Sequence, residues 1–144
     1  MSMKTIYFVH DHQESPAARQ NLLEMAGYQV RLFESSTDLI VALKEESPEL
    51  VLLDVLIDGK NGFETAKEIH GRFADRTYPM VITSRIYRAR QFREEALRCG
   101  AQEYVLLPTK PEDFLRRLSR AMEEHFGGVG SDAARDDTGE SAAA

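Results

Sequence analysis

The sequence predicts an α/β fold in which a doubly wound parallel sheet of five strands carries helices on both faces. Strand-like and helix-like stretches alternate five times along the chain. The most apolar run, residues 50–53, is hydrophobic on both faces, as a buried central strand of a parallel sheet requires. Right-handed crossovers between parallel strands place helices on both sides of such a sheet.

The five expected strands are short runs rich in β-favouring residues. The second run alternates, with Val30 and Leu32 on one face, which suits a strand near a sheet edge. The third run ends at Asp54, and Pro79 precedes the fourth. The expected strands lie at residues 6–9, 28–33, 50–53, 80–83 and 103–107.

The helices between them are marked by caps, chain breakers and apolar spacing. Gly59, Asn61 and Gly62 indicate a loop before the third helix, and the fourth is expected over residues 88–99. The expected starts of the other helices are Ser15 with Pro16, Ser36 or Thr37, and Pro111, and the expected terminators are Gly27, Pro48 and Gly100. The inward-facing residues are expected to be Ala18, Leu22, Met25 and Ala26; Leu39, Ile40 and Leu43; Phe63, Ala66, Ile69 and Phe73; Ala89, Phe92 and Ala96; and Phe114, Leu115, Leu118 and Met122.

Composition divides the chain into a domain at residues 4–126 and a low-complexity tail at residues 127–144. The tail has too little apolar surface to offset its ordering entropy, so we expect it to be disordered, either as a free tail or as the stub of a linker. No apolar run approaches the roughly 20 residues that span a bilayer. Cys99 is the only cysteine, which favours a reducing cytoplasm, and the net charge of −6 argues against nonspecific nucleic-acid binding.

Two carboxylates follow neighbouring strands of the predicted sheet. Asp11 comes after the first strand and Asp54 after the third, so both side chains are expected at one edge of the sheet. Close carboxylates repel each other unless a cation lies between them, and Mg²⁺ is the simplest such cation. An aspartate beside such an ion can act as a nucleophile toward phosphorus. The hydroxyl of Ser84 or Thr83, at a third strand end, is placed to hydrogen-bond the new phosphoryl oxygens.

With these residues in place, the chain resembles the receiver domain of bacterial response regulators, a CheY-like, flavodoxin-like fold, over residues 4–126. Four blocks carry the resemblance by their order and spacing: YFVHDH, PELVLLDVLIDGKNGFE, PMVITS and GAQEYVLLP. In the second block, Gly62 keeps the family's spacing of eight residues from the aspartate. The resemblance implies the strand order 2-1-3-4-5 with five helices, and a cis-proline in the last block.

The resemblance also implies roles for individual residues. Asp54 would be the phosphoacceptor, and Asp11, Asp54 and the backbone carbonyl of Leu56 would bind Mg²⁺. Ser84, with Thr83 beside it, would supply the switch hydroxyl, and the rotamer of Tyr104 would report the position of that switch. A sensor histidine kinase or phosphotransfer protein would supply the phosphoryl group, and phosphorylation would repack the face made by the fourth helix, fifth strand and fifth helix, which contacts a downstream protein.

Three positions depart from the family pattern. Leu107 replaces the lysine before the proline, so one donor to the phosphoryl oxygens is absent. His10 replaces the first acid of the acidic pair and is a poor ligand for Mg²⁺. Arg85 stands where a small residue is usual. Two hypotheses follow: either Asp54 is still phosphorylated, with Arg85 or Lys110 as the substitute cation, or the domain is a degenerate pseudo-receiver that binds proteins independently of phosphorylation.

Other functions fit less well. Arginines on the expected fourth helix indicate a solvated face or an acidic protein partner. Neither a second domain nor a helix-turn-helix pattern is present, which argues against DNA binding. A flavin-binding protein needs a phosphate loop after the first strand, where this chain has charged residues. A phosphatase with an aspartate nucleophile needs an acid two residues later, where Leu56 stands. We therefore expect a signalling module that is not an enzyme, apart from phosphoryl transfer to Asp54 and hydrolysis from it.

Overall fold

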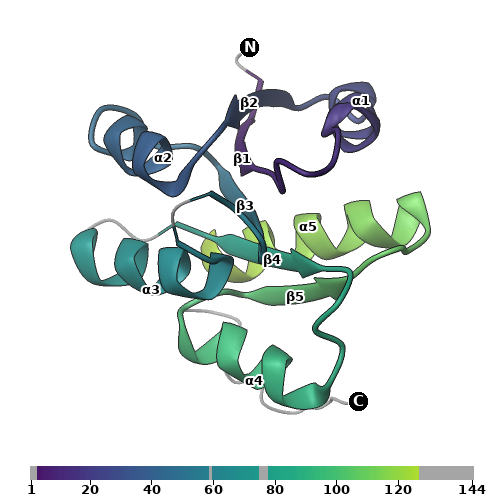
Figure 1. The fold of residues 1–144 in the computed structure, drawn as a ribbon. Coiled ribbons are helices and arrows are strands. Elements are labelled where there is room, and N and C mark those ends of the chain that lie inside the picture. Colours follow the sequence, from purple (N-terminus) through teal and green to yellow (C-terminus); the bar gives the residue numbers. More distant parts are fainter. Residues whose placement is uncertain (1–2, 59, 75–77, 127–144) are drawn as a thin grey trace.

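The computed structural model describes residues 3–58, 60–74 and 78–126. Five parallel strands form one sheet in the order β2-β1-β3-β4-β5 (Figure 1), which confirms the predicted fold class and strand order. The strands are β1 (Thr5–Val9), β2 (Gln29–Phe33), β3 (Leu50–Asp54), β4 (Met80–Ser84) and β5 (Glu103–Leu106). Gly59 of the expected loop and the expected tail at residues 127–144 lie outside the described residues.

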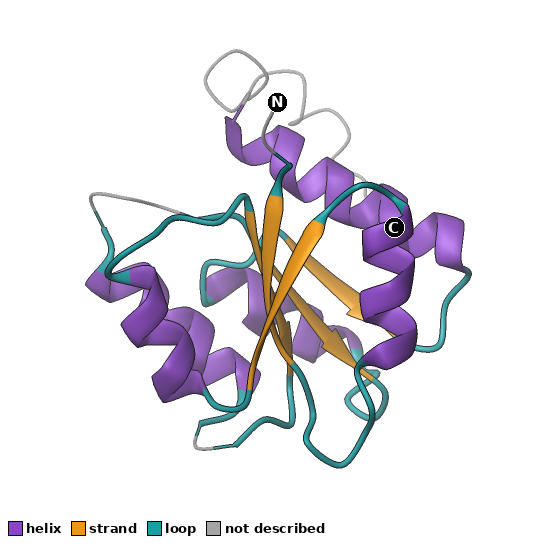
Figure 2. Ribbon diagram, turned by 90° about the horizontal axis from the view of Figure 1, so that it is seen from above, coloured by secondary structure: helices purple, strands orange, loops and turns teal. Residues whose placement is uncertain are grey.

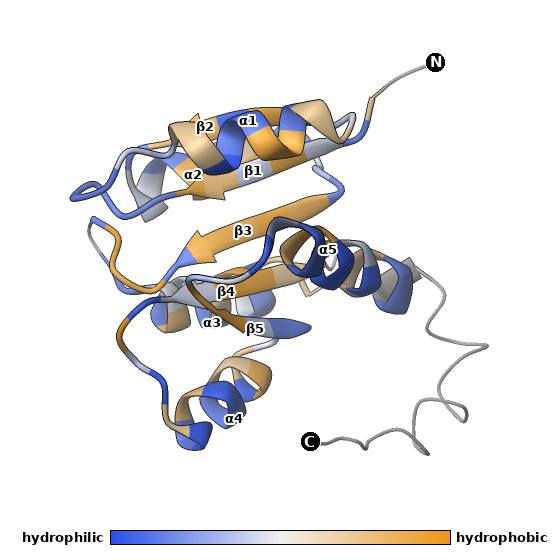
Figure 3. Ribbon diagram, turned by 90° about the vertical axis from the view of Figure 1, so that its right-hand side faces the viewer, coloured by the Kyte–Doolittle hydropathy of each residue, from blue (hydrophilic) through white to orange (hydrophobic). Residues whose placement is uncertain are grey.

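Helices cover both faces of the sheet (Figure 2). They are α1 (Ala17–Met25), α2 (Ser36–Leu43), α3 (Gly62–Arg72), α4 (Arg90–Arg98) and α5 (Pro111–Phe126). One apolar layer joins the sheet to α2, α3 and α4, and the other joins it to α1 and α5. The centre of the sheet is therefore buried on both sides, and every residue of β3 is buried, whereas the edge strand β2 is largely exposed. Figure 3 shows β3 as hydrophobic along most of its length.

Two expected inward faces are wrong in part. Met25 on α1 is 87% exposed and the expected inward residues Ala18 and Ala26 are exposed as well, whereas Leu23 is fully buried, so the inward face of α1 is rotated from the expected one. Arg19, one turn before Leu23, lies on this inward side. Ala89 is exposed because α4 begins one residue later and Ala89 is its N-cap. Ala96 of α4 is buried as predicted.

Helix starts also differ from prediction. Ser35, rather than Ser36 or Thr37, caps α2, since its hydroxyl accepts a hydrogen bond from the Asp38 N–H. Pro16 is the N-cap of α1 rather than its first residue. No helix in the described ranges is both long and apolar enough to cross a membrane.

The start of α3 fixes the backbone beside Asp54. Asn61 and Glu64 form a reciprocal capping box, each accepting a hydrogen bond from the other's backbone N–H. The next residue, Gly62, lies so close to β3 that a Cβ atom there would stand 2.5 Å from the Asp54 carbonyl oxygen. The glycine at this position is therefore required by the close approach of two backbones.

Candidate functional site

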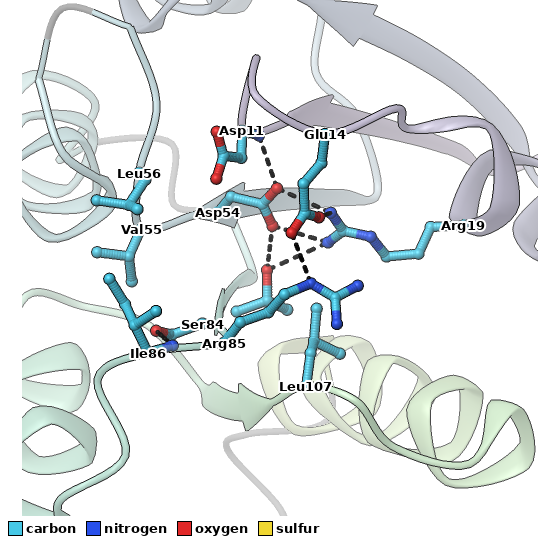
Figure 4. A pocket seen from close by; sticks show the side chains of 11 residues that line it. Asp11, Glu14, Arg19, Asp54, Val55, Leu56, Ser84, Arg85, Ile86 and Leu107 are labelled. Atoms are coloured by element: carbon cyan, nitrogen blue, oxygen red, sulfur yellow. Dashed lines mark hydrogen bonds and ion pairs between the residues drawn. The ribbon is translucent and has the colours of Figure 1, made fainter.

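A pocket lies at the carboxyl ends of β1, β3 and β4, the edge at which the sequence places its polar residues (Figure 4). Three carboxylates line it, those of Asp11, Glu14 and Asp54. Two guanidinium groups, those of Arg19 and Arg85, lie among them. The pocket therefore contains negative and positive side chains next to each other and is not a purely acidic cluster.

The Asp54 carboxylate is at the centre of this pocket, and its side chain is 8% exposed. Its Oδ1 accepts from Arg19 Nη1 at 2.7 Å and from the Thr83 hydroxyl. Its Oδ2 accepts from Arg19 Nη2 at 2.8 Å and from the Asp11 N–H at 2.7 Å. Each oxygen thus accepts hydrogen bonds from two donors, so the roughly four acceptor sites of the carboxylate are all filled.

Arg19 is the site residue that sequence reasoning missed. It reaches from α1 to Asp54 with its side chain 12% exposed, and its guanidinium carbon lies 4.6 Å from the centre of the Phe8 ring. The available signal was helical spacing, because Arg19 precedes the buried Leu23 by four residues and so shares its face. The expected inward face of this helix includes Met25 and not Leu23, so it does not place Arg19 on the buried side.

Asp11 lies beside Asp54 as predicted, but its own carboxylate is partly engaged. Its Oδ1 accepts from the Gln13 N–H at 2.8 Å, in a turn local to the β1–α1 loop. Leu56 lines the pocket and is 44% exposed. His10 is not among the lining residues, and its ring makes an edge-to-face contact with Phe8 at 5.8 Å between ring centres.

Ser84 and Tyr104, the expected switch pair, are close together in the structure. The Ser84 Oγ accepts from the N–H groups of Ile86 and Tyr87, so it organises the start of the loop after β4. The Tyr104 hydroxyl donates to the Tyr87 carbonyl at 2.6 Å, and its ring is buried. Burial raises the pKa of Tyr104, and a hydrogen bond with Ser84 partly opposes that rise.

The positions that depart from the expected pattern lie at different places around the pocket. Leu107 lines it, and its peptide bond to Pro108 is cis. Arg85 also lines it, but its Nε donates to Glu14 at 2.7 Å rather than to Asp54. Lys110 is exposed and is not among the lining residues. Of the two substitute cations considered, only Arg85 is in the pocket.

The sequence matches a known protein family over most of the described domain. The model of the response regulator receiver domain matches residues 6–119. The chain belongs to the response regulator receiver domain family. Receiver domains of this kind serve in the phosphorelay signalling of two-component systems and are generally not enzymes.

Known receiver proteins resemble this one along most of the chain. Protein PilH of Pseudomonas aeruginosa is 24% identical over 127 residues, which cover 83% of this chain and 98% of PilH. The transcriptional regulatory protein GltR of the same species is 32% identical over 121 residues, which cover 83% of this chain and 49% of GltR. The chain thus spans nearly all of PilH and about half of GltR.

Solved structures show the same fold. The CheY-like receiver domain protein of Methanospirillum hungatei superposes with a TM-score of 0.76 at 21% identity, covering 88% of this chain and 99% of that one. The BeF3-activated N-terminal receiver domain of Klebsiella pneumoniae RstA superposes with a TM-score of 0.74 at 25% identity, covering 83% and 98%.

Receiver domains typically bind Mg²⁺ at the phosphorylation site, and the pocket of this receiver does not fit that ion in the arrangement observed. Mg²⁺ needs a near-octahedral set of oxygen ligands with free lone pairs. The Asp54 oxygens are both occupied by donors, and a guanidinium lies against them. Among the residues that the structure describes, no three His, Cys, Asp or Glu side chains form a group that could hold a metal ion.

Proposed function

We propose that this receiver domain accepts a phosphoryl group on Asp54 from a sensor histidine kinase or phosphotransfer protein. The observation that carries the proposal is the position of the Asp54 carboxylate. It lies in a pocket at the carboxyl end of the central strand, between Asp11 after β1 and Thr83 on β4. A carboxylate so placed is held for reaction with a group that enters the pocket from solvent.

The transfer is a displacement at phosphorus. One Asp54 oxygen attacks the phosphorus of a donor phosphohistidine, an O–P bond forms, and the P–N bond breaks. The electron pair of that bond leaves with the imidazole nitrogen. The attacking oxygen must first release at least one of its hydrogen bonds. Arg19 then remains within reach of the phosphoryl oxygens, to which a guanidinium binds well.

We propose that Ser84 carries the signal from the pocket to the face formed by α4, β5 and α5. In the structure its hydroxyl accepts from two N–H groups of the loop after β4, and Tyr104 donates to the carbonyl of that same loop. If the Ser84 hydroxyl moved toward a phosphoryl group, the two N–H groups of this loop would lose their acceptor, and the hydrogen bond from Tyr104 to the loop would be released with them. The loop and α4 are therefore the elements expected to move.

The surface of α4 favours an acidic protein partner. Arg88 donates to the Leu107 carbonyl and Arg98 pairs with Glu95, so these two are occupied within the domain. Arg90 and Arg93 make no ion pair in the described part of the chain. Reversing their charge should weaken partner binding, measured by co-purification, whereas reversal of Arg72 on α3 should not. Unchanged binding after reversal of Arg90 and Arg93 would count against this face.

We also propose that residues 4–126 act as one domain in the cytoplasm. The family match from residue 6 to residue 119 supports these limits. Cys99, the only cysteine, is a buried free thiol, which suits a reducing compartment.

A second candidate function is a pseudo-receiver whose protein contacts do not depend on phosphorylation. The hydrogen-bond saturation of Asp54 favours it, because a carboxylate with four donors is a poor nucleophile until a donor leaves. Leu107 favours it as well, since its side chain offers no donor for a phosphoryl oxygen.

Phosphate-affinity gels distinguish the two functions. The wild type and Asp54→Ala are incubated with acetyl phosphate or with a cognate kinase and its ATP. Under the proposed function, a retarded band forms with the wild type and is absent with Asp54→Ala. If the wild type gives no retarded band beyond that of Asp54→Ala, the pseudo-receiver is the function of this chain.

A further inference from the structure

We propose that the guanidinium of Arg19 takes the place of a divalent cation in this receiver and that the resting pocket therefore excludes Mg²⁺. The charge that an ion supplies from solution would be supplied here by a side chain of α1. The inference concerns the unphosphorylated pocket and holds for either candidate function.

The geometry of the ion pair supports this assignment. Arg19 binds both oxygens of Asp54 through its two terminal nitrogens, at 2.7 and 2.8 Å. Two parallel N–H to oxygen bonds make the fork that guanidinium and carboxylate groups form most strongly. A cation approaching Asp54 would have to break this fork or displace the Thr83 hydroxyl or the Asp11 N–H.

Other contacts hold Arg19 in this position. Its guanidinium lies over the ring of Phe8, and its Nη1 also approaches the Thr83 hydroxyl oxygen at 3.3 Å. The Arg19 and Asp54 side chains are only 12% and 8% exposed. An ion pair so far removed from water is weakly screened by salt and holds its geometry. Arg19 is thus placed by packing as well as by charge.

The remaining acids of the pocket do not offer Arg19 an equal alternative. Glu14 is the nearest other carboxylate, at 4.0 Å from Arg19, but it already pairs with Arg85 at 2.7 Å. Asp11 has one oxygen in a bond to the Gln13 N–H. An incoming metal ion would therefore leave the Arg19 charge, which is 12% exposed, without a full partner, and this is costly.

A metal titration of the wild type, Arg19→Gln and Arg31→Gln tests the proposal. Free Mn²⁺ is measured by electron paramagnetic resonance, and Mg²⁺ is followed through the amide signals of Asp11 and Asp54 in ¹⁵N-labelled protein. Arg31 is the matched control, because its guanidinium also lies over aromatic rings, those of Tyr7 and Phe33, and its loss removes the same charge. Circular dichroism checks that each variant is folded.

The expected result is no saturable binding by the wild type or Arg31→Gln at millimolar metal. Arg19→Gln should bind at least ~tenfold more tightly, and adding Asp54→Asn to it should remove that gain. Saturable binding by the wild type that shifts both amides would overturn the proposal, and this arm does not depend on the folding of any variant. A folded Arg19→Gln that binds no metal would overturn it too, since the guanidinium would then not be what excludes the ion.

The metal titration and the phosphate-affinity gel test different proposals, and each can fail without the other. A wild type that is not phosphorylated but also binds no metal refutes phosphoryl transfer and leaves the role of Arg19 standing. A wild type that is phosphorylated and also binds Mg²⁺ refutes the role of Arg19 and leaves phosphoryl transfer standing.

Discussion

Asp54 is bound from three elements at once, and the strength of that binding is the main property of the site at the scale of residues. Arg19 comes from α1, Thr83 from β4, and the Asp11 N–H from the loop after β1. Buried charges of this kind are tolerated only when they are paired and fully hydrogen-bonded. The same contacts that make the carboxylate stable also reduce its readiness to react.

Loss of Arg19 should therefore destabilise the domain. Arg19→Gln leaves the buried Asp54 charge without its main partner, and we expect the free energy of unfolding to fall by about 3 kcal/mol. Urea denaturation followed by circular dichroism measures the change. Arg31→Gln, which breaks no ion pair in the described part of the chain, should cost less. In Arg19→Gln with Asp54→Asn, the combined loss should be smaller than the sum of the two single losses; simple additivity would mean that the pair is not coupled.

Gly62 and Gly71, both on α3, should respond in opposite directions to alanine. A Cβ at Gly62 would meet the Asp54 carbonyl oxygen at 2.5 Å, so Gly62→Ala must displace the backbone of β3 or α3 and should cost about 2 kcal/mol. Nothing lies within 4 Å of a Cβ at Gly71, where alanine should stabilise the helix by about 0.5–1 kcal/mol. Chemical denaturation of the two variants compares them, and a tolerated Gly62→Ala would show that the two backbones can separate.

At the scale of elements, a group of aromatic rings joins the helices next to the pocket. Phe63 of α3 stacks with Phe92 of α4 at 6.3 Å between ring centres and with Tyr104 of β5 at 5.9 Å. Phe92 also packs against Tyr87 at 4.9 Å. A change at Ser84 that moves Tyr87 therefore reaches α3 and α4 through direct contact.

The pH dependence of stability should report on Tyr104. Because burial raises the pKa of Tyr104 in the folded state above its ordinary value of 10.0, the unfolded chain loses the phenol proton first as pH rises. Stability from this group is thus fully present below pH 10.0 and is lost as pH rises through the folded value. Tyr7, whose pKa is raised by burial and by Glu46, contributes a loss of the same sign.

Tyr104→Phe isolates the contribution of Tyr104. At neutral pH the variant loses the hydrogen bond to the Tyr87 carbonyl and should be less stable by about 1 kcal/mol. It also lacks the titrating group, so the difference from the wild type should narrow as the solution becomes alkaline. Urea denaturation at neutral and alkaline pH measures this difference. A difference that stays constant or widens would contradict the assigned direction of the Tyr104 pKa.

At the scale of the whole molecule, the sequence predicts the fold and the position of the site better than the contacts within the site. Alternating elements and the apolar run before Asp54 determine a parallel sheet, and its carboxyl edge follows from topology. This is why Asp11, Asp54 and Ser84 could be brought to one edge without a structure. A short side chain lies close to its own backbone, so the place of a strand end in the sheet determines where that side chain lies.

The contacts of long side chains do not follow from the sheet topology in this way. Arg19 reaches Asp54 from a helix, and only the helix phase, set by Leu23 rather than Met25, turns it inward. Lys110 stands close to Leu107 in sequence yet does not line the pocket, whereas Arg85 lines the pocket and pairs with Glu14. A flexible cation has several acids within its reach, and the packing around it decides which one it binds.

Borohydride reduction shows directly whether Asp54 receives the phosphoryl group. Reduction converts an aspartyl phosphate into homoserine, which tandem mass spectrometry then locates in the sequence. After treatment of the wild type with acetyl phosphate or a phosphorylated kinase, we expect homoserine at position 54 and none in Asp54→Ala. Homoserine at another aspartate, such as Asp11, or its absence from the wild type would show that Asp54 is not the phosphoacceptor.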